Sequence, residues 1–160
     1  MPTRLIVMRH AKSSWPDASL DDHEHPLNER GRSDAPRIAQ ELHDRNWIPD
    51  RIRVSSSKRT METLELMEAI SRNSTIDVEP SLYHSNISTL MQAVEEVEEG
   101  KTTMILSHNP GSEILVHQLS NRLEVMPTAA AALFEKQQEG WTLVHVLRPK
   151  SLSEYYSIHG

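Results

Sequence analysis

Two arginines and two histidines in this sequence could together bind and transfer a phosphoryl group. They are Arg9, His10, Arg59 and His108, and each comes shortly after a short apolar run. Guanidinium groups offer paired N–H donors that match phosphate oxygens, and a neutral imidazole nitrogen can attack phosphorus. A second imidazole can donate a proton or a hydrogen bond to the same oxygens. The four residues are therefore candidates for a phosphoryl-binding pocket.

The apolar runs before these residues predict strands that would bring them together. Residues 5–8 are expected to form a strand buried on both faces, and residues 103–106 another strand. Shorter strands are expected at residues 52–54 and 76–78. In open α/β sheets the ligand crevice lies beyond the carboxyl ends of the strands. If the strands are neighbours, the two arginines and the two histidines meet at that edge.

Helices are predicted between the strands from apolar residues at helical spacing. The first of these apolar stripes covers residues 35–42, and its helix is expected to begin after an N-cap at either Asn28 or Ser33. Ser57 is expected to cap the next helix, whose apolar residues extend to Ile70. That cap would put Arg59 in the first helical turn, where free backbone N–H groups favour an anion.

Two later helices and a hairpin complete the expected order of elements. A helix is expected over residues 87–97, ending at Gly100. Asn109 is expected to cap another, with Pro110 as its first residue. The alternation of strands and helices predicts a three-layer α/β/α fold with a mainly parallel central sheet. Residues 128–148 are expected to add a C-terminal β-hairpin, and the length of 160 residues predicts one domain over residues 1–160.

Composition excludes several classes of site and partner. The absence of cysteine rules out a disulfide framework, a thiolate metal site and a cysteine nucleophile. A net charge of −6 argues against a nucleic-acid partner. The N-terminal apolar run of roughly five residues is too short for a signal segment or a membrane span, so no membrane partner and a cytoplasmic location are expected.

The order of these motifs resembles that of the histidine phosphatase superfamily, in particular its short SixA-like phosphohistidine phosphatase branch. The matching segments are residues 9–13, 26–31, 55–60 with Thr63, and 107–110. The resemblance implies a phosphoglycerate-mutase-like fold and a phosphatase reaction in which His10 is transiently phosphorylated. It also implies that Arg9, Arg59 and His108 hold the phosphoryl group, that water then attacks phosphohistidine, and that no metal or organic cofactor takes part.

Departures from the family pattern bear on the substrate. Pro16 stands where mutase-like members often have a phosphate-contacting Asn, so that contact is either lost or supplied by Ser13 or Asn109. Members that act on sugar phosphates use a carboxylic acid from the segment matching residues 79–88, where this chain offers Glu79. A phosphoramidate can leave as a protonated imidazole and needs less help. The expected substrate is therefore phosphohistidine in a protein, such as a signalling or phosphotransfer protein, or a similarly activated phosphate.

Three other interpretations remain open at this point. The first is a non-catalytic module that binds phosphate or phosphohistidine, and the second is a small-molecule phosphatase or mutase acting on a small phosphoester. The third concerns His23 and His25, which lie beside carboxylates and could be drawn as a metal site. Their alternate spacing in a polar loop favours a solvated loop instead.

Overall fold

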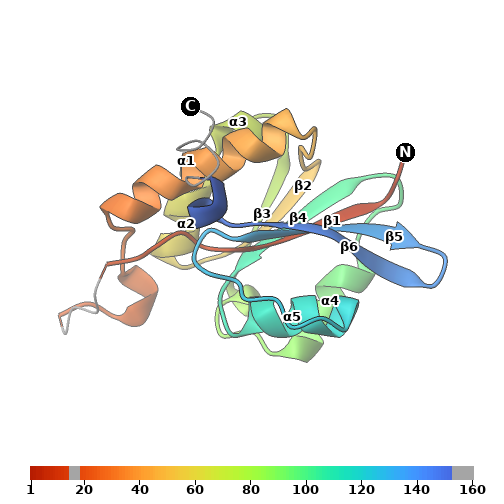
Figure 1. The fold of residues 1–160 in the computed structure, drawn as a ribbon. Helices are drawn as coiled ribbons and strands as arrows, with labels where there is room; N and C mark the ends of the chain where they lie inside the picture. Colours follow the sequence, from red (N-terminus) through yellow and green to blue (C-terminus); the bar gives the residue numbers. More distant parts are fainter. Residues whose placement is uncertain (15–18, 153–160) are drawn as a thin grey trace.

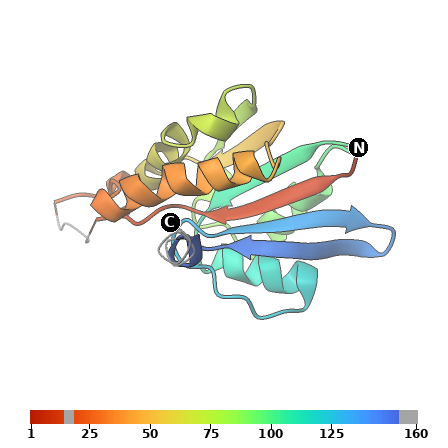
Figure 2. The ribbon, with the colours of Figure 1, turned by 45° about the horizontal axis from the view of Figure 1, so that its top comes forward.

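The fold is built on one six-stranded sheet with strand order β3-β2-β4-β1-β5-β6. The computed structural model of the chain describes residues 1–14 and 19–152, so Pro16 lies outside the described residues. The strands are β1 (Arg4–Arg9), β2 (Arg51–Ser55), β3 (Thr75–Glu79), β4 (Thr102–Ser107), β5 (Ala131–Gln137) and β6 (Gly140–Leu147). Strands β1 to β4 run parallel, while β5 and β6 form an antiparallel hairpin beside β1 (Figure 2). Both the mainly parallel sheet and the C-terminal hairpin are confirmed.

Helices cover both faces of the sheet and give the expected three layers (Figure 1). One face carries α1 (Glu29–Asp44), α2 (Lys58–Glu65) and α3 (Glu68–Ser71), and the other carries α4 (Ile87–Glu95) and α5 (Gly111–Ser120). Two 3₁₀ turns, η1 (Asp22–Glu24) and η2 (Pro80–Leu82), lie in the loops after β1 and β3.

Strand β1 is buried on both faces because its apolar side chains alternate between two cores. Ile6 and Met8 pack in the core under α1 to α3, whereas Leu5 and Val7 pack in the core under α4 and α5. All four side chains are fully buried. Such burial on both sides is typical of a central parallel strand, and it fixes the point at which the next residues, Arg9 and His10, leave the sheet.

The strand order places side by side the ends of the three strands that precede the candidate residues. Strand β4 lies between β1 and β2, with Arg9 opposite Ser107 and Val54 opposite Leu106. The segments that follow β1, β2 and β4 therefore begin at one edge of the sheet. The condition under which the two arginines and the two histidines would meet, adjacency of these strands, is therefore fulfilled.

Helix ends agree with the sequence in part. Asn28, and not Ser33, caps α1, since its Oδ1 accepts a hydrogen bond from the Gly31 N–H at 2.9 Å. Ser57 caps α2 as predicted. The single helix expected to reach Ile70 is divided into α2 and α3 at residues 66–67, where backbone N–H groups turn to carbonyls three residues back.

The helix expected to end at Gly100 is shorter. Helix α4 ends at Glu95, because a separate turn follows in which the Lys101 N–H donates to the carbonyl of Glu98. Gly100 lies in that turn with a φ of 76°, a value that favours glycine.

Gly31 allows α1 to pass close to the loop after β1, and this contact gives a test of the fold. A Cβ added at Gly31 would lie 2.2 Å from the carbonyl oxygen of Lys12, a backbone atom. We expect Gly31→Ala to lower the free energy of unfolding by about 1–3 kcal/mol, measured by urea titration. Ser33→Ala, at an exposed position of the same helix, is the control and should change it by less than about 0.5 kcal/mol. Equal losses in the two variants would contradict the close approach.

Candidate active site

A cavity of about 320 Å³ lies at the edge of the sheet where the parallel strands end. Its lining residues come from α2, from the segment after β3 and from the segment after β4: Arg59, Tyr83, His84, Ser85, His108, Asn109, Pro110 and Gly111. The ring of His10 lies beside it, with its centroid 5.3 Å from that of His108. Three separate strand ends therefore contribute to one site.

His10 is held in a single tautomer by its own chain. The side chain is 6% exposed, and its Nδ1 lies 2.6 Å from the carbonyl oxygen of Ala11. A carbonyl oxygen can only accept, so Nδ1 carries the proton and Nε2 keeps its lone pair. The backbone N–H of His10 donates to the Ser107 carbonyl, and its own carbonyl accepts from the Ala129 N–H. The sheet thus fixes an imidazole whose Nε2 is available for attack.

His108 is fixed by two contacts with the segment that follows β2. Its Nε2 lies 2.7 Å from Oγ of Ser55, and its Nδ1 lies 3.4 Å from Nη2 of Arg59. Because a guanidinium only donates, Nδ1 is the accepting nitrogen and Nε2–H donates to Ser55. A neutral His108 therefore fits this arrangement.

Burial and neighbouring cations keep both histidines neutral. Burial, aided by the charges of Arg59 and Arg9, lowers the pKa of His10 to about 4. Burial, the interaction with His10 and the charge of Arg59 lower the pKa of His108 to about 3. Each value lies below the ordinary pKa of 6.5, so both rings are uncharged near neutral pH.

An NMR titration of the imidazole Cε1–H signals tests this electrostatic description. Without a bound anion, we expect His10 to titrate near pH 4 and His108 near pH 3, each assigned by loss of its signal in the alanine variant. A midpoint near 6.5 for His10 would contradict the buried, cation-flanked environment.

The two arginines differ in the contacts that hold them. Nη1 of Arg9 donates to the Met126 carbonyl at 3.1 Å, whereas its buried Nε has no hydrogen-bond partner in residues 1–14 and 19–152. Burial lowers the pKa of Arg9. The side chain of Arg59 is 11% exposed and reaches both His108 and the loop after β1. An anion placed between these groups would receive N–H donors that the protein itself does not fully use.

The cap predicted for Asn109 is wrong. Helix α5 begins at Gly111 after Pro110, with no side-chain cap. The amide of Asn109 instead donates to Oε2 of Glu113 at 2.7 Å and to the Met126 carbonyl at 3.0 Å. These two hydrogen bonds hold the amide through its N–H groups, while Oδ1, the atom that a cap would use, accepts no hydrogen bond in the described residues. They also tie α5 to the segment that binds Arg9.

Asn109 and Ser13, the two predicted auxiliary contacts, are placed differently. Asn109 lines the cavity, and its Oδ1 is buried without a partner in the described part of the chain. Ser13 forms a backbone bridge with Leu27 in the loop after β1 and does not belong to the cavity lining.

Glu79 is engaged away from the cavity. Its two carboxylate oxygens accept from Nε and Nη2 of Arg53 at 2.5 and 2.6 Å, across neighbouring strands β2 and β3. Its segment instead contributes Tyr83, His84 and Ser85 to the lining. A carboxylic acid from this segment is therefore not available at the site in this arrangement.

Sequence reasoning missed Asp22, Tyr83 and Ser55. The Asp22 carboxylate accepts from Nη2 of Arg59 and from the Tyr83 hydroxyl, whereas the sequence predicted a polar loop there without a role for Asp22. The predicted clustering of Arg9 and Arg59 was the one signal in the sequence for such a residue, because a carboxylate is favoured beside clustered cations.

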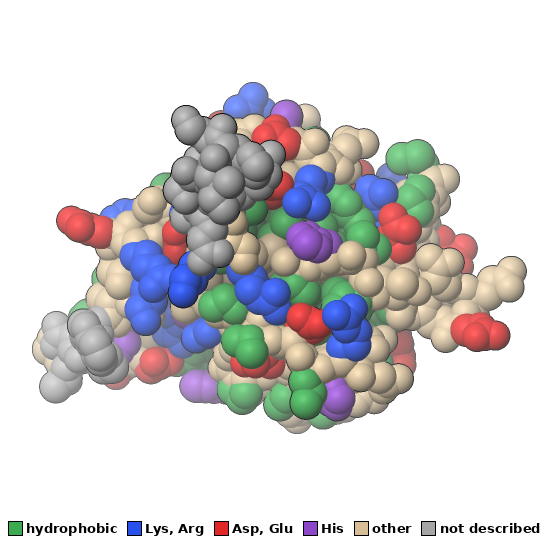
Figure 3. All heavy atoms as spheres, in the orientation of Figure 1, with side chains coloured by type: hydrophobic (Ala, Val, Ile, Leu, Met, Phe, Trp, Pro, Cys, Tyr) green, Lys and Arg blue, Asp and Glu red, His purple; other side chains and the backbone are tan. Residues whose placement is uncertain are grey.

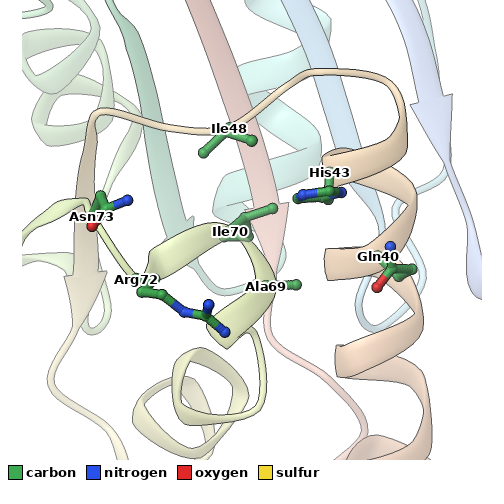
Figure 4. A pocket seen from close by; sticks show the side chains of 7 residues that line it. All are labelled: Gln40, His43, Ile48, Ala69, Ile70, Arg72 and Asn73. Carbon is green, nitrogen blue, oxygen red and sulfur yellow. The ribbon is translucent and has the colours of Figure 1, made fainter.

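Two surface features lie outside the cavity lining: a group of basic side chains and a second hollow. Figure 3 shows Lys and Arg side chains gathered on the left of the drawn face, the side on which the parallel strands of Figure 1 end. Another hollow, of about 340 Å³, lies between α1 and α3 and shares no lining residue with the cavity beside His108 (Figure 4). Its lining residues are Gln40, His43, Ile48, Ala69, Ile70, Arg72 and Asn73.

In the described residues, no helix is both long and apolar enough to cross a membrane.

Known proteins share this fold and these motifs. The pattern of the histidine phosphatase superfamily (branch 1) matches residues 5–103, a range that holds Arg9, His10 and Arg59. An uncharacterized chloroplastic protein of Arabidopsis thaliana is 35% identical over 150 residues, which cover 86% of this chain and 68% of the relative.

Solved structures extend the match beyond that range. A protein assigned as phosphohistidine phosphatase SixA from Agrobacterium tumefaciens is 26% identical, with a TM-score of 0.83 over 93% of this chain and 99% of that one. The protein histidine phosphatase SixA in complex with tungstate shares the fold, with a TM-score of 0.80 at 23% identity over 93% and 99% of the two chains. The chain therefore belongs to the histidine phosphatase superfamily.

Proposed function

We propose that this chain is a phosphatase that works through a phosphohistidine on Nε2 of His10. The observation that carries the proposal is the 2.6 Å contact between Nδ1 of His10 and the Ala11 carbonyl. That contact leaves the Nε2 lone pair free, and the lowered pKa keeps it free near neutral pH. A side chain 6% exposed loses little freedom when it reacts.

The four residues would divide the reaction between attack and charge stabilisation. Nε2 of His10 forms a bond to phosphorus while the bond to the leaving group breaks with its electron pair. Arg9 and Arg59 would hold the phosphoryl oxygens with their N–H groups. The negative charge of the bound phosphoryl group would raise the pKa of His108, which would take up a proton from solvent and donate a hydrogen bond to one of these oxygens. Water would then attack the phosphohistidine and release orthophosphate. In this scheme guanidinium groups supply the positive charge, and no metal or organic cofactor is required.

Ser13 and Asn109 remain auxiliary substrate contacts in the proposal. Both N–H groups of the Asn109 amide already have acceptors, so a contact with phosphate would require one of them to be exchanged. Ser13 lies in the loop after β1, three residues after His10, and its hydroxyl would be the contact with a phosphoryl oxygen.

The proposed substrate is phosphohistidine in a protein, or a similarly activated phosphate, in the cytoplasm. The ion pair of Glu79 with Arg53 supports this choice, because an alkoxide leaving group needs an acid that this segment does not supply. A phosphorylated imidazolium loses its phosphoryl group to give neutral imidazole, so it needs no such acid. The likeness to SixA at 26% identity supports the same class of substrate.

Relative activity on three phosphates tests the proposal. We expect kcat/KM to be highest for a histidine-phosphorylated carrier protein, lower for p-nitrophenyl phosphate and lowest for 3-phosphoglycerate. A preference for 3-phosphoglycerate would indicate a small-molecule phosphatase or mutase. Stabilisation against heat by orthophosphate without turnover of any of the three would indicate a binding module.

A further inference from the structure

Asp22 occupies the phosphate-binding fork of Arg59 in the structure. Nη1 of Arg59 donates to the backbone carbonyl of Asp22 at 2.8 Å, and Nη2 donates to its Oδ2 at 3.1 Å. This paired arrangement is the one that a guanidinium makes with two oxygens of a phosphoryl group. An incoming phosphoryl group must therefore compete with Asp22 for the same donors.

Residues of the cavity mouth hold Asp22 in this place. The Tyr83 hydroxyl donates to the same Oδ2 at 2.5 Å, and the ring of Tyr83 packs edge-on against His23. Nε2 of His23 lies 2.9 Å from Oγ of Ser56, which ties η1 to the segment after β2. The hydrogen bond from Tyr83 and the charge of Arg59 lower the pKa of Asp22, so the carboxylate is ionised.

The Asp22 side chain is 56% exposed, whereas Arg59 is 11% exposed. The carboxylate therefore lies at the solvent-exposed end of this contact, whereas Nη2 of the same guanidinium also lies 3.4 Å from Nδ1 of His108, further inside. A substrate that enters from solvent and places phosphorus near His10 has its leaving group on the side of Asp22 and Tyr83.

We propose that Asp22 is a specificity-determining residue that selects a nitrogen leaving group. The inference rests on the proposed function of His10 and adds the choice of leaving group to it. When substrate binds, the phosphoryl oxygens replace Asp22 as hydrogen-bond acceptors of Arg59. The Asp22 carboxylate, still bound by the Tyr83 hydroxyl, then accepts a hydrogen bond from the N–H of a phosphorylated imidazolium. A carboxylate stabilises that cation and repels a leaving oxyanion.

The step needs no further reactant. The phosphorylated imidazolium carries a proton on the ring nitrogen remote from phosphorus, and Asp22 accepts a hydrogen bond from that N–H. When Nε2 of His10 forms its bond to phosphorus, the electron pair of the breaking P–N bond returns to the leaving nitrogen. The product is a neutral imidazole that keeps the same proton. An aryl or sugar phosphate has no such N–H, and its leaving oxygen gains negative charge as the P–O bond breaks.

The test compares Asp22→Asn on two substrates, because the amide keeps the size of the side chain and removes its charge. We expect kcat/KM for phosphohistidine on a carrier protein to fall about tenfold or more, the loss of a charge-assisted hydrogen bond. For p-nitrophenyl phosphate we expect a rise of about two- to fivefold, since an exposed ion pair no longer competes for Arg59. The ratio of the two constants should therefore change by about 20-fold or more.

Two variants serve as controls. Asp21→Asn removes a charge from the adjacent exposed position and should leave the ratio of the two constants within about twofold. Tyr83→Phe keeps the charge of Asp22 but removes the hydroxyl that holds it, so the ratio should shift in the same direction by less. Thermal unfolding confirms that each variant is folded.

Outcomes that overturn the inference differ from those that overturn the proposed function. Equal losses on both substrates in Asp22→Asn would show that Asp22 only orients Arg59, and no change on either would show that it does not reach the leaving group. In both cases His10→Ala would still be inactive. Full activity of His10→Ala would instead remove the proposed function itself.

Discussion

His10→Ala is expected to lower kcat/KM on every substrate of the enzyme by on the order of 10⁴-fold or more, because it removes the nitrogen that bonds to phosphorus. His108, whose ring lies beside that of His10, cannot take over as nucleophile. Its Nε2 is hydrogen-bonded to Ser55 and its Nδ1 faces Arg59. The measurement is release of orthophosphate from p-nitrophenyl phosphate and from phosphohistidine.

The matched control for His10→Ala is His43→Ala in the remote hollow, which should retain wild-type activity. The His10 variant should also still bind orthophosphate, since Arg9 and Arg59 remain, and its thermal unfolding in phosphate reports that binding. Activity within tenfold of wild type would contradict the assignment of His10 as nucleophile.

Arg59→Ala has the second largest expected effect, a loss of about 10² to 10³-fold in kcat, because one arm of the charge stabilisation disappears from a buried site. Arg59→Lys should recover part of the activity, since an ammonium keeps the charge but cannot bind two oxygens with a planar fork. Steady-state kinetics on p-nitrophenyl phosphate give both values.

The control for Arg59 is Arg72→Ala, which removes an exposed guanidinium from the hollow between α1 and α3. It should leave kcat within about twofold of wild type, as surface substitutions usually do. A loss of less than about tenfold in Arg59→Ala would show that Arg9 and His108 suffice to hold the phosphoryl group.

The strands and the residues at their ends could be predicted because each strand is encoded by a local run of apolar residues. The fully apolar run at residues 5–8 predicts a strand buried on both faces, and the structure divides it between two cores. The hairpin over residues 131–147 was predictable from its turn at Glu139–Gly140. The order β2-β4-β1 could only be assumed, since it depends on packing between distant segments.

Side-chain partners across loops could not be predicted from the sequence. Asn109 is of a residue type that favours N-caps and stands directly before Pro110, but the Met126 carbonyl and Glu113 come within its reach only after the chain folds. Asp22 and Tyr83 are 61 residues apart, and neither neighbourhood in the sequence indicates their hydrogen bond. Loops of this kind take their conformation from tertiary contacts, so periodicity and propensity do not describe them.

The central claim is that the phosphoryl group passes through Nε2 of His10, and trapping the phosphorylated protein tests it most directly. The protein would be mixed with phosphoramidate, quenched in alkali, in which phosphohistidine persists, and digested for mass spectrometry. We expect one phosphoryl group on the peptide that contains His10, lost on treatment with acid and absent from His10→Ala. A phosphoryl group on His108 or any other residue, or turnover without any phosphorylated protein, would contradict the account.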